Sequence, residues 1–596
     1  MHQGGPGGTP GPGPHLPERP SAAHRAPGGW PLTVFLTPDQ VPFFAGTYFP
    51  PAPAHGMPAF DEVLERVGGA WKEQRGSIDA QNERMIEALA ALQAPPTGEG
   101  AVDDAAQAAR DALAAEFDRD FGGFGDAPKF PRPASLSHLL AHYAAEDDRE
   151  ALHMVARSLQ RMGLGGIFDQ VGGGFARYSV DRYWMIPHFE KMLCDNALLL
   201  GVYADAWRVT GDELFARVVE ETVDWLQREM RVDDGGFASA VDADSADGEG
   251  AYYLWTPDEI RATLPPQEAR LVIHRFGLDG RPNFHGRWHL HVHATFSELA
   301  AGLGEPRERL RQRWESARLR LQQARSERPA PARDDKRLTA WNALAAWALA
   351  RAGRLLGRED WQDEAAATLA FVDGHLWRGG RLLARYALGE AEYPAYLDDH
   401  AYLLWALLEQ LQGRWEDRWL ERAGTVADLL LERFENPVDG GFYFTADDHE
   451  PLIQRPYGFS DDALPNGGAV ATRALLRLAA LTGKGHYQEA AERAIEAARG
   501  AVGRAPPAHC AMLEAVLEAN QGVETVLIRA PATDDVEAWR RAAEPAFSPF
   551  RQVFVLPAGS APGLGPARGA RVCRVRHCLP DAHTPEALAD LLQTQA

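Results

Sequence analysis

The chain has 596 residues, 45% of them apolar, and a formal net charge of −23. That length suffices for about three or four domains, and the apolar content is ordinary for a globular protein. No run of about 18 apolar residues occurs and the first residues lack a secretory pattern, so we expect no membrane partner and a cytoplasmic location. The negative charge argues against nucleic acid as a partner.

Cysteine and lysine are both scarce. Four cysteines are too few for a disulfide framework in so long a chain, which fits a reducing compartment. Only five of the 61 basic residues are lysines, and this preference for arginine indicates a GC-rich genome and a bacterial source. Lys129, Lys191 and Lys336 all lie in glycine-aromatic motifs, where a compact ammonium group differs from the planar fork of arginine. We therefore count them as candidate substrate-binding residues.

The first 95 residues fall into two parts that differ in composition. Residues 1–27 are rich in glycine and proline and predict a disordered tail. In residues 28–95, a strand over 32–36, a turn, a strand over 41–49 and one helix over 60–92 are expected. A hairpin and one helix are too little for a stable domain, so the hairpin is expected to be partly exposed or packed on the rest of the chain.

Residues 96–520 predict alternating charged and apolar helices, with a long insertion at 232–335. The charged helices are expected at 102–117, 148–164, 211–231, 360–377, 415–434 and 485–502. The apolar helices are expected at 134–145, 188–209, 338–356, 396–413, 465–483 and 507–520. Six apolar helices ringed by six amphipathic ones describe an (α/α)6 toroid, and the protein is mainly α. A straight helical solenoid is the alternative, but its repeats are more regular.

One rim of this toroid is expected to carry the function. The loops from charged to apolar helices are long and share a glycine-aromatic signature, whereas the opposite loops are short. Long loops on one face of a rigid scaffold are where binding sites usually lie. The residues that this topology gathers at the rim are Lys129, Arg177, Tyr178, Trp184, His188, Glu190, Asp242, Asp244, Trp255, Lys336, Trp341, Asn342, Tyr396, Asp399, His400 and Asn466.

The stretch from Gly165 to Ala197 is the most informative of these loops. Pro187 suits the first position of a helix, which then continues apolar to Gly211. His188, Lys191 and Asp195 would share one face of that helix. We expect its first turns to point into a polar site.

Residues 521–596 predict a small α/β appendage of three strands and two helices. Its two cysteines, Cys573 and Cys578, are spaced wrongly for a zinc knuckle and are expected to be structural.

Several motifs resemble those of the spermatogenesis-associated protein 20 family. They are Trp30-Pro31, TPDQ, GTYFPP, APKFP, QVGGGFARYSVD, PHFEKMLCDNA, SAVDADS with EGAYYLW, and WNAL. The resemblance extends from residue 28 to the end. It implies that 28–95 are the C-terminal half of a thioredoxin-like domain, with Pro31 as its cis-proline and a Cys-x-x-Cys pair on the missing first half. It also implies a barrel similar to six-hairpin glycosidases and N-acylglucosamine 2-epimerases.

Sugar chemistry suits the residues at the rim. The catalytic candidates are His188, Glu190, Asp242, Asp244, Asp399 and His400. The substrate-binding candidates are Lys129, Arg177, Tyr178, Trp184, Lys191, Trp255, Lys336, Trp341 and Asn342. A hydrolase needs two carboxyl groups, one from Asp242 or Asp244 and the other from Glu190 or Asp399, whereas an epimerase would use the two histidines.

Three hypotheses stay open. The first is a carbohydrate-active isomerase or hydrolase, the second a redox or chaperone-like protein, and the third a non-catalytic module that binds sugar or protein. No cysteine precedes Cys194, which counts against thiol chemistry in this chain. The aspartates at 242–245 do not match an EF-hand, so no metal and no cofactor are expected. Oligomeric state is left open.

Overall fold

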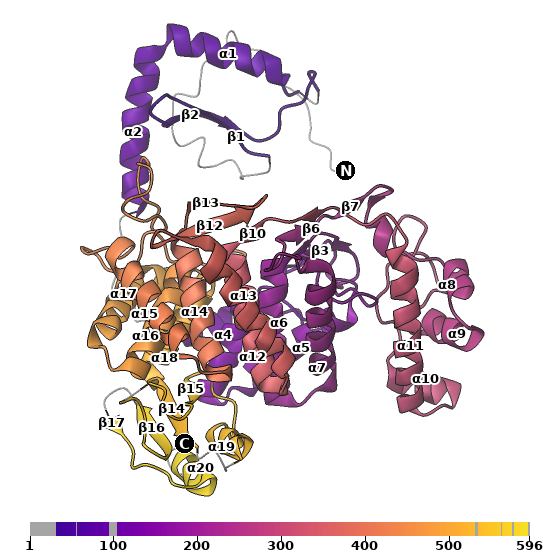
Figure 1. Cartoon of the computed structure of the whole chain (residues 1–596). Coiled ribbons are helices and arrows are strands. Elements are labelled where there is room, and N and C mark those ends of the chain that lie inside the picture. Colours follow the sequence, from indigo (N-terminus) through magenta and orange to yellow (C-terminus); the bar gives the residue numbers. More distant parts are fainter. Residues whose placement is uncertain are drawn as a thin grey trace. The chain divides into compact units, whose positions relative to one another are not determined.

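The computed structural model describes residues 31–54, 56–93, 104–530, 535–561, 563–574 and 577–593. The expected tail at 1–27 and Trp30 lie outside them. The chain divides into two compact units (Figure 1). One comprises residues 1–94 and 450–456, and the other comprises residues 95–449 and 457–596.

The described part of the first unit contains the expected hairpin. Strands β1 (Thr33–Leu36) and β2 (Pro42–Gly46) pair antiparallel. The single helix expected over 60–92 is two helices, α1 (Phe60–Glu73) and α2 (Arg75–Gln93). The break at Gln74 lets Ile78 join the small core around Phe43.

One face of this hairpin is left uncovered. Leu32, Val34 and Leu36 alternate along the first strand and are all exposed. Alternating side chains of a strand share one face of a sheet, and further strands or helices normally cover an apolar face. The hairpin therefore presents apolar side chains on one face, and its partial exposure or packing on the rest of the chain stays a prediction.

Twelve helices in the described part of the second unit form the predicted (α/α)6 toroid. The outer helices are α3 (Ala105–Glu116), α5 (Arg149–Leu164), α7 (Glu213–Trp225), α13 (Glu359–Phe371), α15 (Asp417–Arg433) and α17 (Gly485–Arg504). The inner helices are α4 (Pro133–Glu146), α6 (Leu193–Thr210), α12 (Thr339–Leu356), α14 (Leu397–Gly413), α16 (Gly467–Thr482) and α18 (Cys510–Gln521). Successive inner helices contact one another in chain order, and α18 contacts α4, which closes the ring.

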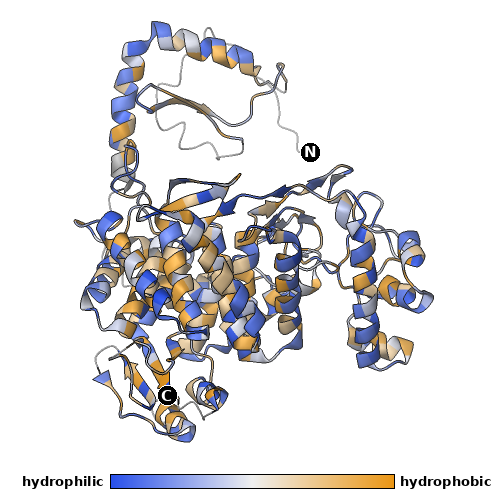
Figure 2. Ribbon diagram, in the orientation of Figure 1, coloured by the Kyte–Doolittle hydropathy of each residue, from blue (hydrophilic) through white to orange (hydrophobic). Residues whose placement is uncertain are grey.

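The inner helices carry the core because they are enclosed on both sides. Apolar residues dominate them, whereas the outer helices alternate apolar and hydrophilic faces (Figure 2). Gly211, Gly357 and Gly483 end α6, α12 and α16 with φ of 66°, 68° and 72°. Glycine adopts this left-handed conformation without a Cβ penalty, so the turns into the next outer helices are tight.

Two of the outer helices end as α-helices before the predicted residue and continue as a π-helical turn. The helix predicted over 211–231 is α7 followed by a π-helical turn, Leu226–Met230, and the one predicted over 360–377 is α13 followed by Val372–Leu376. Each of these turns leads into a rim loop.

Short strands at the rim replace the helix start predicted at Pro187. Strand β4 (Pro187–His188) pairs with β3 (Tyr178–Ser179), and β5 (Lys191–Met192) pairs with β6 (Ala240–Val241). Helix α6 begins only at Leu193. His188 and Lys191 therefore do not share a helix face with Asp195, because their backbone hydrogen bonds go to neighbouring loops.

Other strands complete the rim. They are β9 (Arg333–Asp334), which pairs with β6, and β10 (Arg337–Leu338), β11 (Trp377–Arg378), β12 (Arg381–Ala387) and β13 (Glu390–Pro394).

The insertion has a hydrophobic core of its own. Its elements are β7 (Asp244–Ser245), β8 (Gly248–Glu249), α8 (Pro257–Thr263), α9 (Pro266–Phe276), α10 (Phe296–Leu303) and α11 (Arg307–Ser326). Trp255 and Trp314 are fully buried in this core, which also takes up Val171 from a rim loop. The insertion is thus an accessory module attached at the rim.

The C-terminal appendage is the predicted α/β element. Its elements are β14 (Glu524–Arg529), α19 (Val536–Ala543), β15 (Arg551–Val555), β16 (Gly569–Arg574), β17 (His577–Cys578) and α20 (Pro585–Gln593). The strand order is β15-β14-β16-β17, with β14 and β15 parallel.

The two cysteines of the appendage, expected to be structural, are linked to each other. Cys573 and Cys578 lie opposite each other on β16 and β17 and form a disulfide. The two strands pair antiparallel, with Cys573 opposite Cys578, so the C-x4-C spacing here joins neighbouring strands. Cys194 and Cys510 are buried and free.

Among the described residues, no helix combines the length and the apolar character needed to cross a membrane.

Candidate functional site

The glycine-aromatic loops at the rim share one internal hydrogen-bond pattern. The loops are Phe117–Phe124, Phe168–Phe175 and Glu435–Phe442, and the first and last residues of each pair as a β-bridge. The second residue of each loop is Asp118, Asp169 or Asn436. Its side-chain oxygen accepts hydrogen bonds from the N–H groups two and three residues later. Because Asp and Asn stabilise turns in this way, the repeated signature specifies loop structure.

Lys129 is buried and stabilises the first loop through hydrogen bonds. Its Nζ donates to Asp118 Oδ2 at 2.7 Å, to the Gly122 carbonyl at 3.0 Å and to the Arg182 carbonyl at 3.0 Å. Burial alone would raise the pKa of Asp118, but hydrogen bonds led by that of Lys129 lower it to about 2. An ammonium group has three donors. All three are used, so the predicted substrate-binding role of Lys129 is wrong.

Lys191 plays the same part in the second loop. Its Nζ donates to Asp169 Oδ2 and to the Gly173 carbonyl, both at 2.9 Å. Arg325 of the insertion donates to the other oxygen of Asp169 at 2.8 Å. Burial opposes the charge of Asp169, yet these two cations hold its pKa well below its ordinary value. Lys191 is thus buried and held by the second loop, which gives it a structural role.

Asn342 and Asn196 clamp rim loops to the first turns of inner helices. Asn342 Oδ1 accepts from the Phe237 N–H at 2.7 Å, and its Nδ2 donates to the Phe237 and Leu338 carbonyls at 3.1 Å. Asn196 makes the same set of contacts with Phe175 and Met192. Asn342 is fully buried, so its side chain is structural and the predicted ligand contact is not supported.

Two predicted sugar-stacking tryptophans are core residues. Trp184 is fully buried and donates from Nε1 to the Phe121 carbonyl at 3.0 Å. Trp255 is 1% exposed, in the core of the insertion, with the Arg328 guanidinium 3.9 Å above its ring. Neither ring has a free face, so both predictions are corrected.

Asp399 and His400 are also structural. Asp399 accepts from the N–H groups of Ala340 and Tyr396 at 2.8 Å each, and burial raises its pKa to about 7 despite these bonds. His400 contacts the Tyr396 carbonyl through Nδ1 at 2.8 Å and packs on Phe434. Burial lowers the pKa of His400 to about 4. Among the described residues, no hydrogen bond or ring contact joins His400 to His188.

Asp242, Asp244 and Lys336 lie on the outer surface of the rim. Asp242 Oδ1 accepts from the Asp244 N–H at 3.1 Å, and both side chains are exposed. Lys336 pairs with Asp334 at 2.9 Å and is 42% exposed. Exposed carboxylates without a cavity around them are poorly suited to acid–base work.

Four predicted residues do come together at the rim. Tyr178 stacks on His188 with ring centres 5.2 Å apart. Arg177 Nη1 donates to Glu190 Oε2 at 3.2 Å, and His188 Nε2 lies 3.7 Å from the same oxygen. His188 Nδ1 is 2.9 Å from Glu249 of the insertion. We call Arg177, Tyr178, His188, Glu190 and Glu249, with Asp195, the rim cluster.

Asp195 is the carboxyl group of this cluster with the most perturbed environment. Within the described structure its Oδ2 is buried without a hydrogen-bond partner. Burial raises its pKa to about 7, with Glu190 acting in the same direction and Arg177 against it. A carboxyl group with a pKa near neutrality, next to a second carboxyl group, suits proton transfer.

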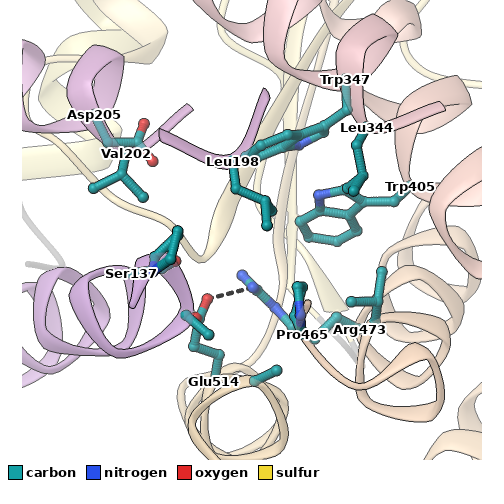
Figure 3. Close-up of a pocket in the computed structure, with 14 residues that line it drawn as sticks. Ser137, Leu198, Val202, Asp205, Leu344, Trp347, Trp405, Pro465, Arg473 and Glu514 are labelled. Atoms are coloured by element: carbon teal, nitrogen blue, oxygen red, sulfur yellow. Dashed lines mark hydrogen bonds and ion pairs between the residues drawn. The ribbon is translucent and has the colours of Figure 1, made fainter. Parts of the chain in front are cut away.

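A cavity lies on the axis of the toroid, enclosed by all six inner helices (Figure 3). We call it the lumen cavity. It offers about 70 Å³ to the centres of water-sized molecules, room for several waters. Its polar lining is Ser137, Asp205, Arg473 and Glu514, and the indoles of Trp347 and Trp405 form part of its wall.

Trp347 approaches α6 closely and leaves its polar atom unused. A Cβ on Gly201 would lie 2.3 Å from the Trp347 ring, so glycine is required there. Trp347 Nε1 is buried and has no acceptor among the described residues. A buried N–H without a partner costs free energy, which an acceptor on a bound molecule would recover.

Ion pairs form a floor beneath the lumen cavity. Arg351 bridges Asp205 at 2.7 Å and Glu409 at 3.2 Å, and Arg354 joins Glu409 at 2.9 Å. On the other side Glu518 pairs with Arg473 and Arg477, and Arg473 also pairs with Glu514. The charged groups of the lining are thus neutralised in place.

The C-terminal appendage closes the end of the toroid below this floor. Arg540 donates to the Gln412 and Gly413 carbonyls, and Gln552 donates to the Arg477 carbonyl. Glu544 pairs with Arg354. The lining of the lumen cavity reaches the rim at Pro133, the first residue of α4, and at Pro465, just before α16.

The rim and the lumen cavity lie on the same faces of the inner helices. On α6, Asp195, Leu198, Val202 and Asp205 follow one another at intervals of three or four residues, and the last three line the cavity. Residues at this spacing share a helix face, so Asp195 lies one turn, about 4.5 Å, above the cavity lining. Trp341 stands in the same relation to Leu344 on α12.

Sequence reasoning missed the lumen residues. Both faces of an inner helix are buried, so periodicity does not tell which face looks toward the axis. Charged residues inside otherwise apolar helices were the signal that could have indicated the lumen. The charged residues of this kind are Asp205, Arg351, Arg354, Glu409, Arg473, Arg477, Glu514 and Glu518.

The comparisons with known proteins agree with this organisation. A family model described as "Protein of unknown function, DUF255", named Thioredox_DsbH, matches residues 19–90. Spermatogenesis-associated protein 20 of Rattus norvegicus is 32% identical over 577 residues, 89% of this chain and 73% of the relative. The Homo sapiens protein is 32% identical over 545 residues, which cover 84% of this chain and 69% of the relative.

A thioredoxin-like segment followed by an (α/α)6 toroid with an axial cavity defines the class of protein. Within that class, the chain belongs to the spermatogenesis-associated protein 20 family. These relatives are animal proteins, which contradicts the expectation of a bacterial source.

Solved structures of similar arrangement include a D-mannose isomerase, with a TM-score of 0.43, 11% identity and coverage of 67% of this chain and 85% of that one. The unsaturated glucuronyl hydrolase of Bacillus sp. GL1 has a TM-score of 0.41 and 14% identity. The match covers 71% of this chain and 95% of that one. Both scores are low, so the fold assignment rests on the closed ring of helices described above.

Proposed function

We propose that the lumen cavity binds a neutral carbohydrate about the size of one pyranose ring, and that the rim cluster carries out acid–base chemistry on it. The observation that carries the proposal is an enclosed cavity with two indoles and an unused buried donor, Trp347 Nε1, in its wall. Sugars present apolar C–H faces and many hydroxyl acceptors, which such a wall matches.

Neutrality of the ligand follows from the lining. Arg473 is paired with Glu514 and Glu518, and Asp205 is paired with Arg351. A charged ligand would have to break one of these pairs or remain unpaired in a site away from water, and both cost free energy. A neutral polyol meets neither obstacle.

The proposed chemistry uses Asp195 as the acid. It is the carboxyl group of the rim cluster with a pKa of about 7, and it lies above the mouth of the cavity. Glu190 is the second carboxyl group, positioned by Arg177. Two carboxyl groups in different environments suit an acid and a base, whether the reaction is hydrolysis or isomerisation.

The thioredoxin-like segment enters this proposal only as an accessory. No cysteine lies in residues 1–193, so no thiol–disulfide step is assigned to it.

We expect Trp347→Phe to weaken sugar binding about three- to tenfold without loss of stability. The variant removes only the indole N–H, which has no partner in the described structure and donates to the ligand in this proposal. Calorimetric titration with a panel of neutral mono- and disaccharides measures binding, and thermal unfolding measures stability.

Trp184→Phe is the matched control. Its Nε1 donates to the Phe121 carbonyl away from the lumen cavity, so this variant should lose stability and keep binding. Asp195→Asn should bind sugar and lose turnover. A wild-type protein that binds no neutral sugar contradicts the whole proposal, while binding without turnover in the wild type leaves a non-catalytic sugar-binding protein.

A further inference from the structure

A groove lies outside the toroid, between the outer helix α7 and helices α9, α10 and α11 of the insertion. It is separate from the lumen cavity and from the rim cluster, with no lining residue in common. The basic residues that line it are Arg217, Arg275, Arg307 and Arg311. The first turn of α10, at Thr295–Ser297, also contributes to its wall.

Arg275 is the unusual member of this set. It is 2% exposed, and no described carboxylate forms an ion pair with it. Nη1 makes one long hydrogen bond, 3.4 Å to the Ala294 carbonyl, and Nε is buried without a partner. The guanidinium lies 3.9 Å over the ring of Phe296. A buried cation with so few polar contacts is costly unless an anion joins it.

The other three arginines of the lining pair with two carboxylates. Arg307 and Arg311 share one acid, Glu213, at 2.8 and 2.6 Å. Arg217 donates to Glu221, while its Nη2 is buried without a partner in the described chain. Burial, with Arg217 nearby, lowers the pKa of Arg275 to about 9, while Glu221 and Glu315 act in the opposite direction.

The acids that line the groove are mostly engaged elsewhere. Asp212 accepts from the Leu214 N–H at the start of α7, and Glu315 pairs with Arg318 at 3.2 Å. Glu308 forms no ion pair among the described residues, and it lies on the exposed surface of α11. Arg275 thus forms no ion pair with the acids of the lining in the described structure.

We propose that this groove is an oxyanion-binding site, in which Arg275 and Arg311 hold the phosphate or carboxylate group of a small molecule. Planar guanidinium groups donate paired hydrogen bonds to such oxygens. The start of α10 is already capped, because the side chains of Thr295 and Glu298 accept each other's N–H groups, so the two guanidinium groups carry the recognition. The bound anion supplies the charge that Arg275 lacks.

The test compares wild-type full-length chain with Arg275→Met by thermal unfolding. The probes are inorganic phosphate and acetate, each titrated against chloride at matched ionic strength. We expect phosphate, acetate or both to raise the wild-type melting temperature in a saturable way, because a ligand of the native state stabilises it. Response to phosphate alone assigns a phosphoryl group as the ligand, and response to acetate as well assigns the broader class.

Arg275→Met should remove that response and should not melt lower than the wild type in chloride. Methionine fills the apolar space beside Phe296 and removes a buried, unpaired charge. Arg311→Met, on a partly exposed position, should keep the fold and weaken anion binding about tenfold. It keeps the test valid if Arg275→Met does not fold.

Arg313→Met is the matched control on the same helix. Arg313 is fully paired with Glu305, at 3.0 and 2.8 Å, and does not line the groove. It should leave the anion response unchanged. A wild-type protein that responds to neither anion overturns the proposal. So does an Arg275→Met variant that melts lower while Arg311→Met leaves an anion response intact, because Arg275 is then a structural cation held by aromatic rings.

Discussion

Replacing Asp169 by asparagine is expected to lower the free energy of unfolding by about 3–5 kcal/mol. Asp169 lies between Lys191 and Arg325, and all three side chains are buried. The amide keeps an oxygen for the N–H groups of Val171 and Gly172 but removes the negative charge that pairs with both cations, and Arg325 keeps only a 4.0 Å contact with Glu229. Breaking a buried pair from one side leaves an uncompensated charge, which is why the effect is large.

Urea unfolding at neutral pH measures this prediction. Asp258→Asn is the control, because that carboxylate forms an exposed pair with Arg261 and should change stability by less than about 1 kcal/mol. Since the pKa of Asp169 is lowered in the folded state, its contribution is present above about pH 4 and is lost as the pH falls toward the folded value. Equal stability of Asp169→Asn and wild type at neutral pH would show that the buried cations find other partners.

Replacing Asp195 by asparagine is expected to change the pH dependence of stability in the opposite sense. The pKa of Asp195 is raised from 3.8 to about 7 in the folded protein. As the pH rises between these values the unfolded chain releases this proton while the folded protein keeps it, so wild-type stability falls by about 1.4 kcal/mol per pH unit from this group. The variant lacks that loss and should be the more stable protein above about pH 7.

Unfolding in urea across about pH 4.5 to pH 8 measures the difference between the two profiles. The integrated effect has an upper limit of about 4 kcal/mol, because each unit of pKa shift corresponds to about 1.4 kcal/mol. Asp398 and Asp461, whose pKa values burial also raises to about 6, keep part of the slope in both proteins. Asp244→Asn, at an exposed position, should follow the wild type. Parallel profiles for wild type and Asp195→Asn would falsify the assignment of a buried, protonated carboxyl group.

The two substitutions together separate loop structure from function. Asp169 and Lys191 support the second rim loop, so a change there acts through folding. Asp195 has no hydrogen-bond partner for its buried oxygen in the described structure, which favours a chemical role over a structural one. An Asp195→Asn variant that is as stable as the wild type but has lost turnover would support a role of Asp195 in function and not in folding.

Sequence by itself determined the fold class and the positions of the helices. Charged and apolar helices alternate strongly enough that each of the twelve ring helices lies within a few residues of its predicted range. Helical periodicity is local, and glycines such as Gly211 and Gly357 mark the ends of inner helices through their backbone freedom. The same local signals placed the appendage strands and the hairpin.

Only the tertiary structure decided which rim residues are free to act. Lys129, Lys191 and Asn342 carry the residue types of a binding site, yet their partners come from loops far along the chain, and spacing does not reveal that these donors are already used. His188 precedes α6 in a strand, because its pairing with Tyr178 outweighs the local preference for a helix start. The lumen cavity and the unpaired Arg275 arise from side chains of several helices meeting in space, and that meeting depends on packing between distant segments.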